Sequence, residues 1–597
     1  MAKKKGGLSS LLIILPYFFG DQEFDRTNTD KLCGPYTYDW RNYIESLLRF
    51  ACRKNFMRQS GQSIFAQAQS RRASRRYPIT YYDVSADGLQ PTSGPQANAR
   101  IEAAAAALWA WGVRPGDRIA LTGINSVDYL VLDQAIGLLG AVSVPIYYTS
   151  PAQETSQLLA QSGASWFFIG DKRVMEQSHK LSTKARLVSF ANAQSLGRPG
   201  VMSWEDFLKK ETKPISVPLT DSLSNPEDLA TIRYTSGTTG TPKGVMFNFG
   251  QLHWMGEALS DLLPWKERNR SVRYLSFLPL SHVVEGILAS YAPYCLLAKV
   301  EVYYLNDFRD LAQELPTVRP TVFFSVPRFY EKLWEQVASS RLGQMWLAAK
   351  EGIYKRILAA VLRRAVLRRA GLDRCRQLIV GSAPMSEALL LRFRALGIEI
   401  HNAYGQTEAP LITINRLGDN IIPTVGTPLP DTEVTLADDG ELIVKGPQVA
   451  LGYYGRPADT MASGELHTGD LGTIHADGHI SLYGRKKEMI VTAYGKNISI
   501  PKIEERLKNI PGVAEAVLIG ENRPFCTALL WLEKESADLD GQIEQMNANL
   551  SHPEQIRKYR IISRPLSIQA GELTPNLKIK RNSVQDHFAA EIEEMYR

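Results

Sequence analysis

Short apolar runs alternate with helical patterns along most of this chain, and no other feature constrains its fold as strongly. The alanine-rich stretch 101–113 predicts a helix that stops at Pro115-Gly116, and the apolar run 119–123 then predicts a buried strand. A second helix and strand at 130–148 repeat this order, and further apolar runs predict buried strands at 165–170, 274–279, 321–326 and 376–382. Helices that alternate with buried strands produce mainly parallel sheets covered on both faces, so the sequence predicts an α/β fold.

Beyond residue 425 the pattern changes to hairpins and then to a smaller unit. Two strand pairs are predicted to turn at Asp439-Gly440 and at Asp477-Gly478. After Arg485, a helix at 500–510 and two strands at 514–520 and 526–532 predict a separate α+β unit. A chain of 597 residues is long for one domain, so we predict an N-terminal arm, a large domain and a small domain at 1–50, 51–485 and 486–597.

The composition is that of a globular protein with a mild positive charge. The net charge of +7 is small for 597 residues, and the sequence contains no zinc-finger pattern, RNP-type string or long basic stretch. We therefore expect no nucleic-acid partner. The five cysteines lie far apart without a CxxC pair, which favours reduced thiols in a cytosolic protein over a disulfide framework.

The segment LATIRYTSGTTGTPKGV at 229–245 predicts a phosphate-binding loop after a strand that ends near Tyr234. Glycines let the backbone approach a polyphosphate, while hydroxyl and amide N–H groups donate hydrogen bonds to its oxygens. This is not a Walker loop, because GxxxxGK[ST] is absent. We expect phosphate contacts from its hydroxyl, glycine and lysine residues, which are Thr235, Ser236, Gly237, Thr238, Thr239, Gly240 and Lys243.

Further strings follow in a fixed order: GSAP at 381–384, NAYGQTEAP at 402–410, LHTGDLG at 466–472, YGRKKEMI at 483–490 and GELTPNLKIKR at 571–581. With these strings the chain, from about residue 75 to its C-terminus, resembles the adenylate-forming superfamily of acyl-CoA synthetases, peptide-synthetase adenylation domains and luciferases. The resemblance implies a large N-terminal α/β domain with mainly parallel sheets covered by helices, plus a small, mobile α+β C-terminal domain. It also implies ATP and Mg²⁺ as cofactors.

The resemblance assigns a role to residues of each string. Tyr404 stacks on adenine, Asp470 accepts hydrogen bonds from the ribose hydroxyls, and Arg485 reaches the ribose and phosphates. Glu408 and Thr235 hold Mg²⁺, for which a carboxylate shared with phosphate is a suitable ligand. The other implied nucleotide contacts are Gly381, Ser382, Ala383, Gly405, Gln406 and Thr407, of which Thr407 contacts the α-phosphate. Lys487 falls at the hinge about which the small domain rotates.

Attack of a carboxylate on the α-phosphorus of ATP gathers negative charge, so this reaction needs positioning and charge neutralisation rather than a general base. The resemblance places Lys578 at the adenylation lysine, with Lys580 and Arg581 close by in the sequence. It places His282 near the acyl carboxylate. Gly495, in YGKNISIPKIEE at 494–505, falls in the loop that lines the path of the pantetheine arm of CoA.

Two strings, LPLSHVVEG at 278–286 and VPRFYEKLW at 326–334, resemble the long-chain fatty acyl-CoA synthetase branch. They imply an AMP-forming long-chain fatty acid:CoA ligase, which makes acyl-AMP and pyrophosphate and then acyl-CoA. Activation of another lipid-like or aryl acid, loading of a carrier protein, and a non-catalytic homologue stay open. The segment 286–304 is apolar enough to line an acyl tunnel, with ordinary core as the alternative. Phe249 departs from the family, in which many relatives have histidine there.

Two segments are candidates for contact with a membrane surface. Residues 1–19 combine Lys3, Lys4 and Lys5 with the apolar run 8–19, which is shorter than the roughly 20 residues that span a bilayer. A packed arm, an interfacial anchor and a signal peptide all stay open for this segment.

The second segment, 353–371, predicts a basic amphipathic helix. Its apolar stripe is expected to contain Leu358, Val361, Leu362 and Ala365, with Arg356 and Arg363 opposite. Contact with anionic lipid and packing on the large domain are both open interpretations. Because ATP and CoA are intracellular, we expect a cytoplasmic protein, with any membrane contact peripheral and at the inner face.

Overall fold

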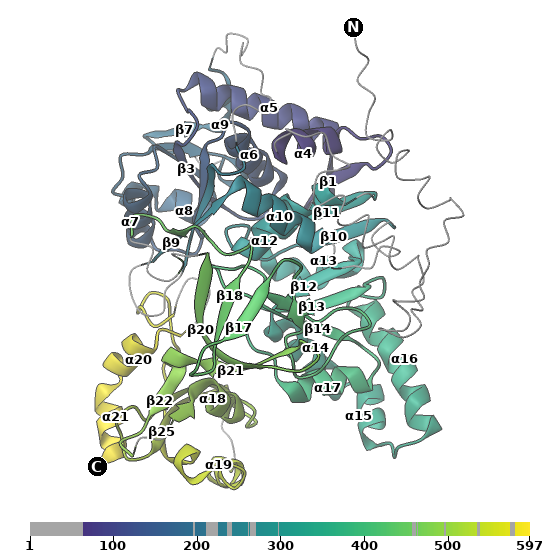
Figure 1. The fold of residues 1–597 in the computed structure, drawn as a ribbon, viewed down its shortest axis with the longest axis vertical. Coiled ribbons are helices and arrows are strands. Elements are labelled where there is room, and N and C mark those ends of the chain that lie inside the picture. Colours follow the sequence, from purple (N-terminus) through teal and green to yellow (C-terminus); the bar gives the residue numbers. More distant parts are fainter. Residues whose placement is uncertain are drawn as a thin grey trace, which may run out of the picture.

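Two large sheets, separated by helices, form the framework of the protein in the computed structural model (Figure 1). The structure describes residues 64–597 apart from gaps at 87, 195–196, 211–224, 236–241, 261, 263–269, 297, 457–460, 462–463, 495–496, 534–537 and 574–578.

The first large sheet has nine strands in the order β16-β15-β14-β13-β12-β10-β11-β1-β2. Its six central strands are parallel, and antiparallel partners are added at both edges. In chain order the strands are β1 (Ile79–Ser85), β2 (Gly88–Ser93), β10 (Val272–Ser276), β11 (Val300–Leu305), β12 (Val322–Ser325), β13 (Gln377–Val380), β14 (Ile400–Tyr404), β15 (Thr413–Ile414) and β16 (Thr427–Pro428).

The second large sheet has eight strands in the order β19-β9-β8-β4-β3-β5-β6-β7. Strands from β8 to β7 in this order run parallel, whereas β9 pairs antiparallel with both β8 and β19. The strands are β3 (Arg118–Gly123), β4 (Val142–Pro145), β5 (Trp166–Gly170), β6 (Arg186–Ser189), β7 (Val201–Ser203), β8 (Leu229–Tyr234), β9 (Gly244–Asn248) and β19 (Gly452–Tyr453).

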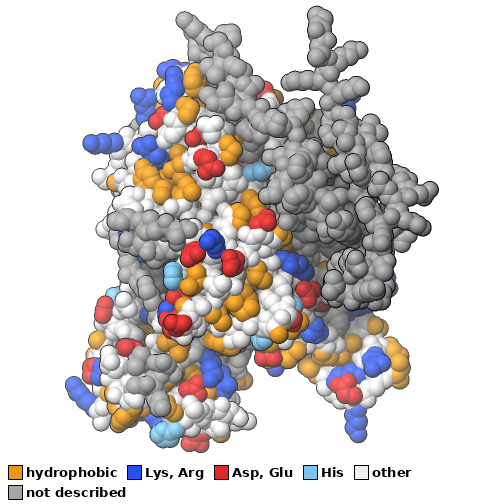
Figure 2. All heavy atoms as spheres, viewed as in Figure 1, with side chains coloured by type: hydrophobic (Ala, Val, Ile, Leu, Met, Phe, Trp, Pro, Cys, Tyr) orange, Lys and Arg blue, Asp and Glu red, His pale blue; other side chains and the backbone are white. Residues whose placement is uncertain are grey.

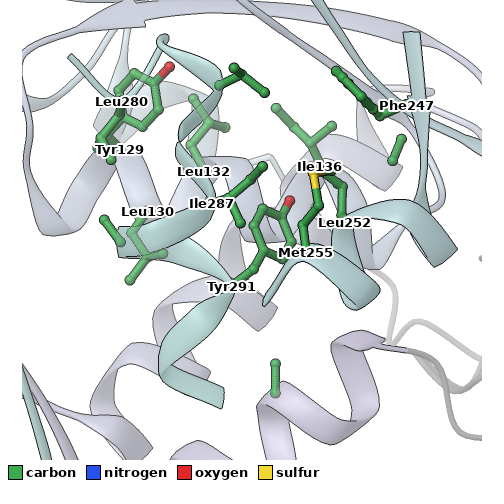
Figure 3. Packing of buried hydrophobic residues seen from close by; sticks show 14 of the residues in the cluster. Tyr129, Leu130, Leu132, Ile136, Phe247, Leu252, Met255, Leu280, Ile287 and Tyr291 are labelled. Carbon is green, nitrogen blue, oxygen red and sulfur yellow. The ribbon is translucent and has the colours of Figure 1, made fainter. Parts of the chain in front are cut away.

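A layer of helices packs between the two large sheets. Helix α6 (Val127–Leu138) contacts β1 of one sheet and β4 of the other, while α10 (Phe249–Ser260) and α12 (Val283–Ser290) pack beside it. Every residue of α6 except Asp128 is buried, as expected of a helix covered on all sides. Figure 3 shows side chains of this layer packed together, among them Tyr129, Leu132, Ile136, Met255, Ile287 and Tyr291.

Other helices complete the large domain. On the far side of the nine-stranded sheet, the core contains residues of α13 (Leu311–Val318), α14 (Pro327–Ser339), α15 (Arg341–Ala348), α16 (Ile353–Arg369) and α17 (Glu387–Ala395). The outer face of the eight-stranded sheet is covered by α7 (Ala152–Ser162) and α8 (Lys172–Glu176). The remaining helices are α4 (Ile64–Arg72), α5 (Gly94–Ala110) and α9 (Trp204–Leu208).

A four-stranded antiparallel sheet lies between the large sheets and the C-terminal part in Figure 1. It consists of β17 (Glu433–Leu436), β18 (Glu441–Lys445), β20 (Glu465–Ile474) and β21 (Ile480–Arg485). Its two hairpins turn at Gly440 and Gly478, whose φ angles of +84° and +85° favour glycine.

Within its described residues, the C-terminal part has two small sheets and four α-helices. Its elements are β22 (Met489–Val491), β23 (Asn497–Ser499), α18 (Ile500–Lys508), β24 (Val513–Ile519), β25 (Cys526–Leu532), α19 (Leu539–Asn547), β26 (Ile556–Ile561), α20 (Arg581–His587) and α21 (Ala589–Tyr596). Strand β25 pairs antiparallel with β24 and parallel with β26. Packing of α18 and α19 on this sheet gives the small unit its own core.

The predicted α/β class, the buried strands and both hairpin turns are confirmed. The predicted stripe of α16 is partly wrong, because Leu358 and Leu362 are buried but Val361 and Ala365 face solvent. The segment 286–304 is mostly core rather than tunnel wall. The described cysteines Cys295, Cys375 and Cys526 form no disulfide, and no helix in the described ranges is long and apolar enough to cross a membrane.

Candidate active site

Several of the predicted site residues follow the carboxyl ends of parallel strands in the nine-stranded sheet. His282 comes after β10, the segment Gly381-Ser382-Ala383 directly after β13, and Gly405 directly after β14. Thr235 directly follows β8 of the other large sheet. In parallel sheets the carboxyl ends of strands form the usual binding crevice, so the fold itself gathers these segments.

Asp470 is the centre of a compact polar group. One of its carboxylate oxygens accepts hydrogen bonds from the Tyr404 hydroxyl, at 2.6 Å, and from the Gln406 side-chain amide. Its other oxygen lies 2.9 Å from Nε of Arg485, which is opposite Asp470 in the β20–β21 pair. Residues from three separate strings therefore meet at one carboxylate.

The Asp470 group combines a buried aromatic ring with a carboxylate. Asp470 and Tyr404 are buried, whereas the Arg485 side chain is 52% exposed. Burial and the neighbouring Asp470 carboxylate raise the pKa of Tyr404 well above its usual range, so its hydroxyl remains a hydrogen-bond donor at neutral pH. Since a carboxylate can accept about four hydrogen bonds, Asp470 can also accept ribose hydroxyls. The arrangement suits a purine nucleoside.

The glycines of the strand-end segments are fixed by close packing. A Cβ on Gly405 would fall well inside contact distance of the Pro410 carbonyl oxygen, so this turn accepts only glycine without movement. A Cβ on Gly381 would lie 3.2 Å from the Phe324 ring and 3.3 Å from the Ala403 carbonyl oxygen. The next residue, Ser382, has a φ of +65°, so this segment turns sharply as it leaves β13.

Glu408 is linked to the phosphate loop through Tyr453. The Tyr453 hydroxyl donates to Glu408 Oε1 at 2.7 Å, and Lys243 Nζ lies 4.7 Å from the centre of the Tyr453 ring. The Lys243 carbonyl in turn accepts a 2.9 Å hydrogen bond from the Thr235 amide. Strand β19, which carries Tyr453, pairs with β9 just beyond the loop. This short strand therefore connects both proposed Mg²⁺ ligands.

The donor set of Thr235 and Glu408 fits Mg²⁺, which prefers hard oxygen ligands and commonly uses one or two carboxylates together with substrate phosphates. Within the described residues, no group of three or more His, Cys, Asp or Glu side chains forms a metal cage. The residues present thus suit an ion that arrives with a nucleotide.

His282 stands at the N-terminal end of α12, on a loop held by buried polar side chains. Arg233 Nη1 donates to the carbonyls of Leu280, Ser281 and His282 at 3.0, 3.1 and 3.3 Å. Asn125, just after β3, donates to the Leu278 carbonyl at 2.7 Å. Arg233 lies on β8 and Asn125 just after β3, so the two side chains fix the His282 loop against the eight-stranded sheet.

An apolar pocket lies next to these segments. It is lined by residues of α10 and α12 and by residues that follow β14 and β16, namely Trp254, Met255, Ala258, Leu259, Val284, Ile287, Pro410, Leu411 and Leu429. It encloses about 10 Å³, close to the lower limit for one water molecule. The pocket is therefore closed in this structure, and any ligand must part its walls.

Sequence reasoning did not identify Tyr453, Arg233 or Asn125. Each acts through a partner far away in the sequence; Tyr453 and Asn125 belong to none of the strings, and the string at 229–245, which contains Arg233, assigned this residue no role. Phe249 is a core residue, 3% exposed, and its ring packs edge-on against Phe65 with the ring centres 5.3 Å apart.

Several predicted residues lie outside the described residues, so their positions stay predictions. These are Ser236, Gly237, Thr238, Thr239 and Gly240 of the phosphate loop, Gly495, and Lys578. The described segments that flank Lys578 are held together, since Leu573 forms a β-bridge with Ile579 and the Lys580 amide donates to the Glu572 carbonyl at 2.7 Å.

Comparison with known proteins identifies the class of enzyme to which this fold and the Asp470 group belong. The family model of AMP-binding enzymes matches residues 67–454, and that of the AMP-binding enzyme C-terminal domain matches residues 487–597. The chain belongs to the family of AMP-binding enzymes. This result confirms the predicted superfamily and its fold class.

Individual relatives agree with the family match. The long-chain-fatty-acid–CoA ligase FadD15 of Mycobacterium bovis is 32% identical over 552 residues, covering 83% of this chain and 91% of the relative. The long-chain-fatty-acid–CoA ligase ACSBG2 of Rattus norvegicus is 25% identical over 585 residues, covering 83% and 86%.

Solved structures share the fold at lower identity. The o-succinylbenzoate CoA synthetase of Bacillus subtilis, in complex with its acyl-adenylate, gives a TM-score of 0.68 at 21% identity and covers 88% of this chain and 98% of that one. The adenylation domain of carboxylic acid reductase from Segniliparus rugosus gives 0.72 at 20% identity and covers 90% and 95%.

Proposed function

We propose that this protein is an AMP-forming long-chain fatty acid:CoA ligase. The observation that carries the proposal is the position of the apolar pocket. Pro410 and Leu411 line it, and they follow Glu408 by two and three residues. An acyl chain in this pocket would therefore place its carboxylate near the proposed Mg²⁺ ligand and the phosphates. The CoA ligase names of the relatives support the same chemistry.

In the first step, a carboxylate oxygen attacks the α-phosphorus of ATP, and the bond to the β-phosphate breaks to release pyrophosphate. We propose that Tyr404, Asp470 and Arg485 hold the nucleoside, that the loop 235–243 holds the phosphates, and that Thr407 contacts the α-phosphate. Gly381, Ser382 and Ala383 border the adenine, with Gly405 and Gln406 beside it. These contacts fix the reacting atoms in line, which is the main requirement of this step.

The charge that builds up in this step must be neutralised. Lys578 would supply positive charge at the α-phosphate, and His282 would contact the acyl carboxylate. Mg²⁺ held by Thr235 and Glu408 would neutralise phosphate charge when it is bound.

In the second step, the CoA thiolate attacks the acyl carbon and AMP leaves, giving the thioester. We propose that Gly495 lies on the thiol path. We propose that the small domain rotates about Lys487 before this step. The small domain must therefore be mobile. On this basis the chain divides into an arm at 1–50, a large domain at 51–485 and a small domain at 486–597.

The site of action is part of the same proposal. Fatty acids partition into membranes, so an enzyme that collects them benefits from peripheral contact with a bilayer. We place the protein in the cytoplasm with contact at the inner face of a membrane, through 1–19 or 353–371. The first of these segments lies outside the described residues.

Pyrophosphate release tests the proposal. The purified full-length protein is assayed with fatty acids of graded length, an aryl acid, and either CoA or an acyl carrier protein as acceptor. The expected result is release that is strongest with long chains and thioester that forms with CoA. Thioester formed only with the carrier protein would replace CoA by that acceptor, and preference for the aryl acid would refute the substrate class.

A pocket variant sharpens this assay. Ala258 is buried in the pocket wall on α10, so Ala258→Leu is expected to shift the preference to shorter chains. Ala103, on the exposed side of α5, provides the matched control Ala103→Leu, which should keep the wild-type profile. An unchanged profile for Ala258→Leu would exclude this pocket as the acyl site.

A further inference from the structure

Helices α15 and α16 form a lobe that projects from the large domain at the lower right of Figure 1. The lobe is anchored by its buried side. Leu358 and Leu362 of α16 belong to the core that contains Trp334 and Trp346, and the two tryptophan rings meet edge-on with centres 6.4 Å apart. One face of α16 is therefore committed to the protein, and its opposite face is available.

The outward face of α16 is unusually apolar along its first half. Ile353, Tyr354, Ile357 and Val361 are 74%, 58%, 56% and 50% exposed. Since Ile353, Ile357 and Val361 are four residues apart, they form one stripe along the helix. Exposed Leu342, Met345 and Leu347 of the neighbouring α15 add apolar surface to the lobe. Large exposed apolar side chains gathered in this way mark an interaction surface.

The second half of the same face is basic. Arg364 and Arg368 continue the stripe after Val361 in steps of three and four residues, and both are exposed. The segment 353–371 contains six Lys or Arg residues and no Asp or Glu. Figure 2 shows hydrophobic and basic side chains on this lobe, together with acidic ones such as that of Glu351, which pairs with Lys355. The charge is thus complementary to an anionic partner.

We propose that the outward face of α16, together with exposed apolar residues of α15, docks on an anionic lipid bilayer. An apolar stripe that continues into arginines matches the layers of a membrane interface, where acyl boundary and charged headgroups lie at different depths. The inference deepens the membrane contact of the proposed function by selecting this lobe over the N-terminal segment. Only the role of the docking, which is access to fatty acids held in the bilayer, rests on the proposed function.

Vesicle co-sedimentation of the full-length protein, without ATP, tests the docking surface independently of turnover. Vesicles of phosphatidylcholine alone are compared with vesicles of equal parts phosphatidylcholine and phosphatidylglycerol. The wild type should bind the anionic vesicles and lose binding as salt is raised. Each arginine near an anionic surface contributes about a fivefold effect, so Arg364→Gln/Arg368→Gln should bind roughly 25-fold more weakly.

Two further double variants complete the design. Ile357→Gln/Val361→Gln should also bind several-fold more weakly although the net charge is unchanged. Lys180→Gln/Lys184→Gln removes the same charge at exposed positions after α8, on the opposite side of the view in Figure 1, and should bind as the wild type does. Thermal unfolding and turnover of a soluble short-chain acid check that every variant is folded.

The outcomes separate the alternatives. Binding that falls for both α16 variants and persists in the control supports the docking surface. The proposal is overturned if the wild type does not bind anionic vesicles, if the control weakens equally, or if both α16 variants bind normally. It is also overturned if deletion of residues 2–19 abolishes binding while the α16 variants retain it. A partner protein would then be the remaining occupant of the lobe.

Discussion

Asp470→Asn keeps the size of the side chain and removes its charge, so it probes the proposed nucleoside site with little change in packing. In the wild type, one carboxylate oxygen accepts from Tyr404 and Gln406, and the other pairs with Arg485. An asparagine amide offers only one acceptor oxygen. Its NH₂ group must therefore face a donor, whichever way the amide is turned.

The expected loss follows from the hydrogen bonds that the ribose hydroxyls would donate to this carboxylate and from the pair that would hold Arg485 towards the nucleotide. A hydrogen bond to a charged group contributes about 1.5–3 kcal/mol. The pair with Arg485 is half exposed, at 52% for the arginine side chain, so its share is at most about 1 kcal/mol. The sum of about 2–4 kcal/mol corresponds to a decrease of roughly 30- to 700-fold in kcat/KM for ATP.

Initial rates of pyrophosphate release at varied ATP and saturating fatty acid measure this decrease. KM for ATP should rise, while KM for the fatty acid stays close to the wild-type value, a division that general destabilisation would not produce. Asp438→Asn makes the same chemical change at an exposed position in the β17–β18 turn and should leave both constants unchanged. A kcat/KM for ATP within about threefold of wild type would refute the ribose assignment.

The remaining predictions concern a turn, a lysine and a buried carboxyl group. Gly405→Ala should lower the adenylation rate about 100-fold, because the new Cβ displaces the segment up to Pro410. The control Gly197→Ala, where a Cβ would stand in open space, should leave the rate unchanged. Near-normal rates for Gly405→Ala would show that the turn tolerates movement. Lys578→Ala should suppress acyl-AMP formation by at least about 100-fold and preserve thioester formation from supplied acyl-AMP. Lys580→Ala is the neighbouring control. Equal loss of both steps in Lys578→Ala would contradict the proposed role of Lys578. Burial raises the pKa of Glu285 to about 8, so the folded state holds a proton that the unfolded state releases above a pKa of 4.5. Compared with Glu285→Gln, the wild type should therefore lose unfolding free energy as pH rises towards 8 in denaturant titrations, by at most about 1.4 kcal/mol per pH unit; a difference independent of pH would show that Glu285 ionises normally.

Local patterns predicted the elements that build the crevice. Strands such as β3 and β13 are short apolar runs bounded by turn residues, and the hairpins at Gly440 and Gly478 need a glycine at a positive φ. Such features depend on neighbours in the sequence, so a single chain reveals them. The strings around Tyr404 and Asp470, and their order along the chain, can likewise be identified from a single sequence.

Contacts between distant segments were beyond the reach of these patterns. The bond between Tyr453 and Glu408 depends on the pairing of β19 with β9, which no spacing in the sequence indicates. For α16, basic residues flank the helix on several sides, so periodicity could not tell which apolar residues face the core. The structure separates them, with Leu358 and Leu362 inside and Val361 outside.

Arg233 shows why the two large sheets act as one unit in the proposed reaction. It lies on β8, two residues before Thr235, and its guanidinium holds three carbonyls of the loop that ends at His282. A Cβ on Gly286 would lie 2.6 Å from the same guanidinium, so α12 packs directly against it.

Arg233 also acts on a buried carboxyl group in this interior. Burial raises the pKa of the Asp133 carboxyl, and the nearby Arg233 guanidinium opposes that rise. Loss of the Arg233 side chain would leave three buried carbonyls without this donor, which is costly in an interior. The segment expected to hold the acyl carboxylate is therefore fixed in place relative to the start of the phosphate loop, and this is the condition that in-line attack on the α-phosphorus imposes.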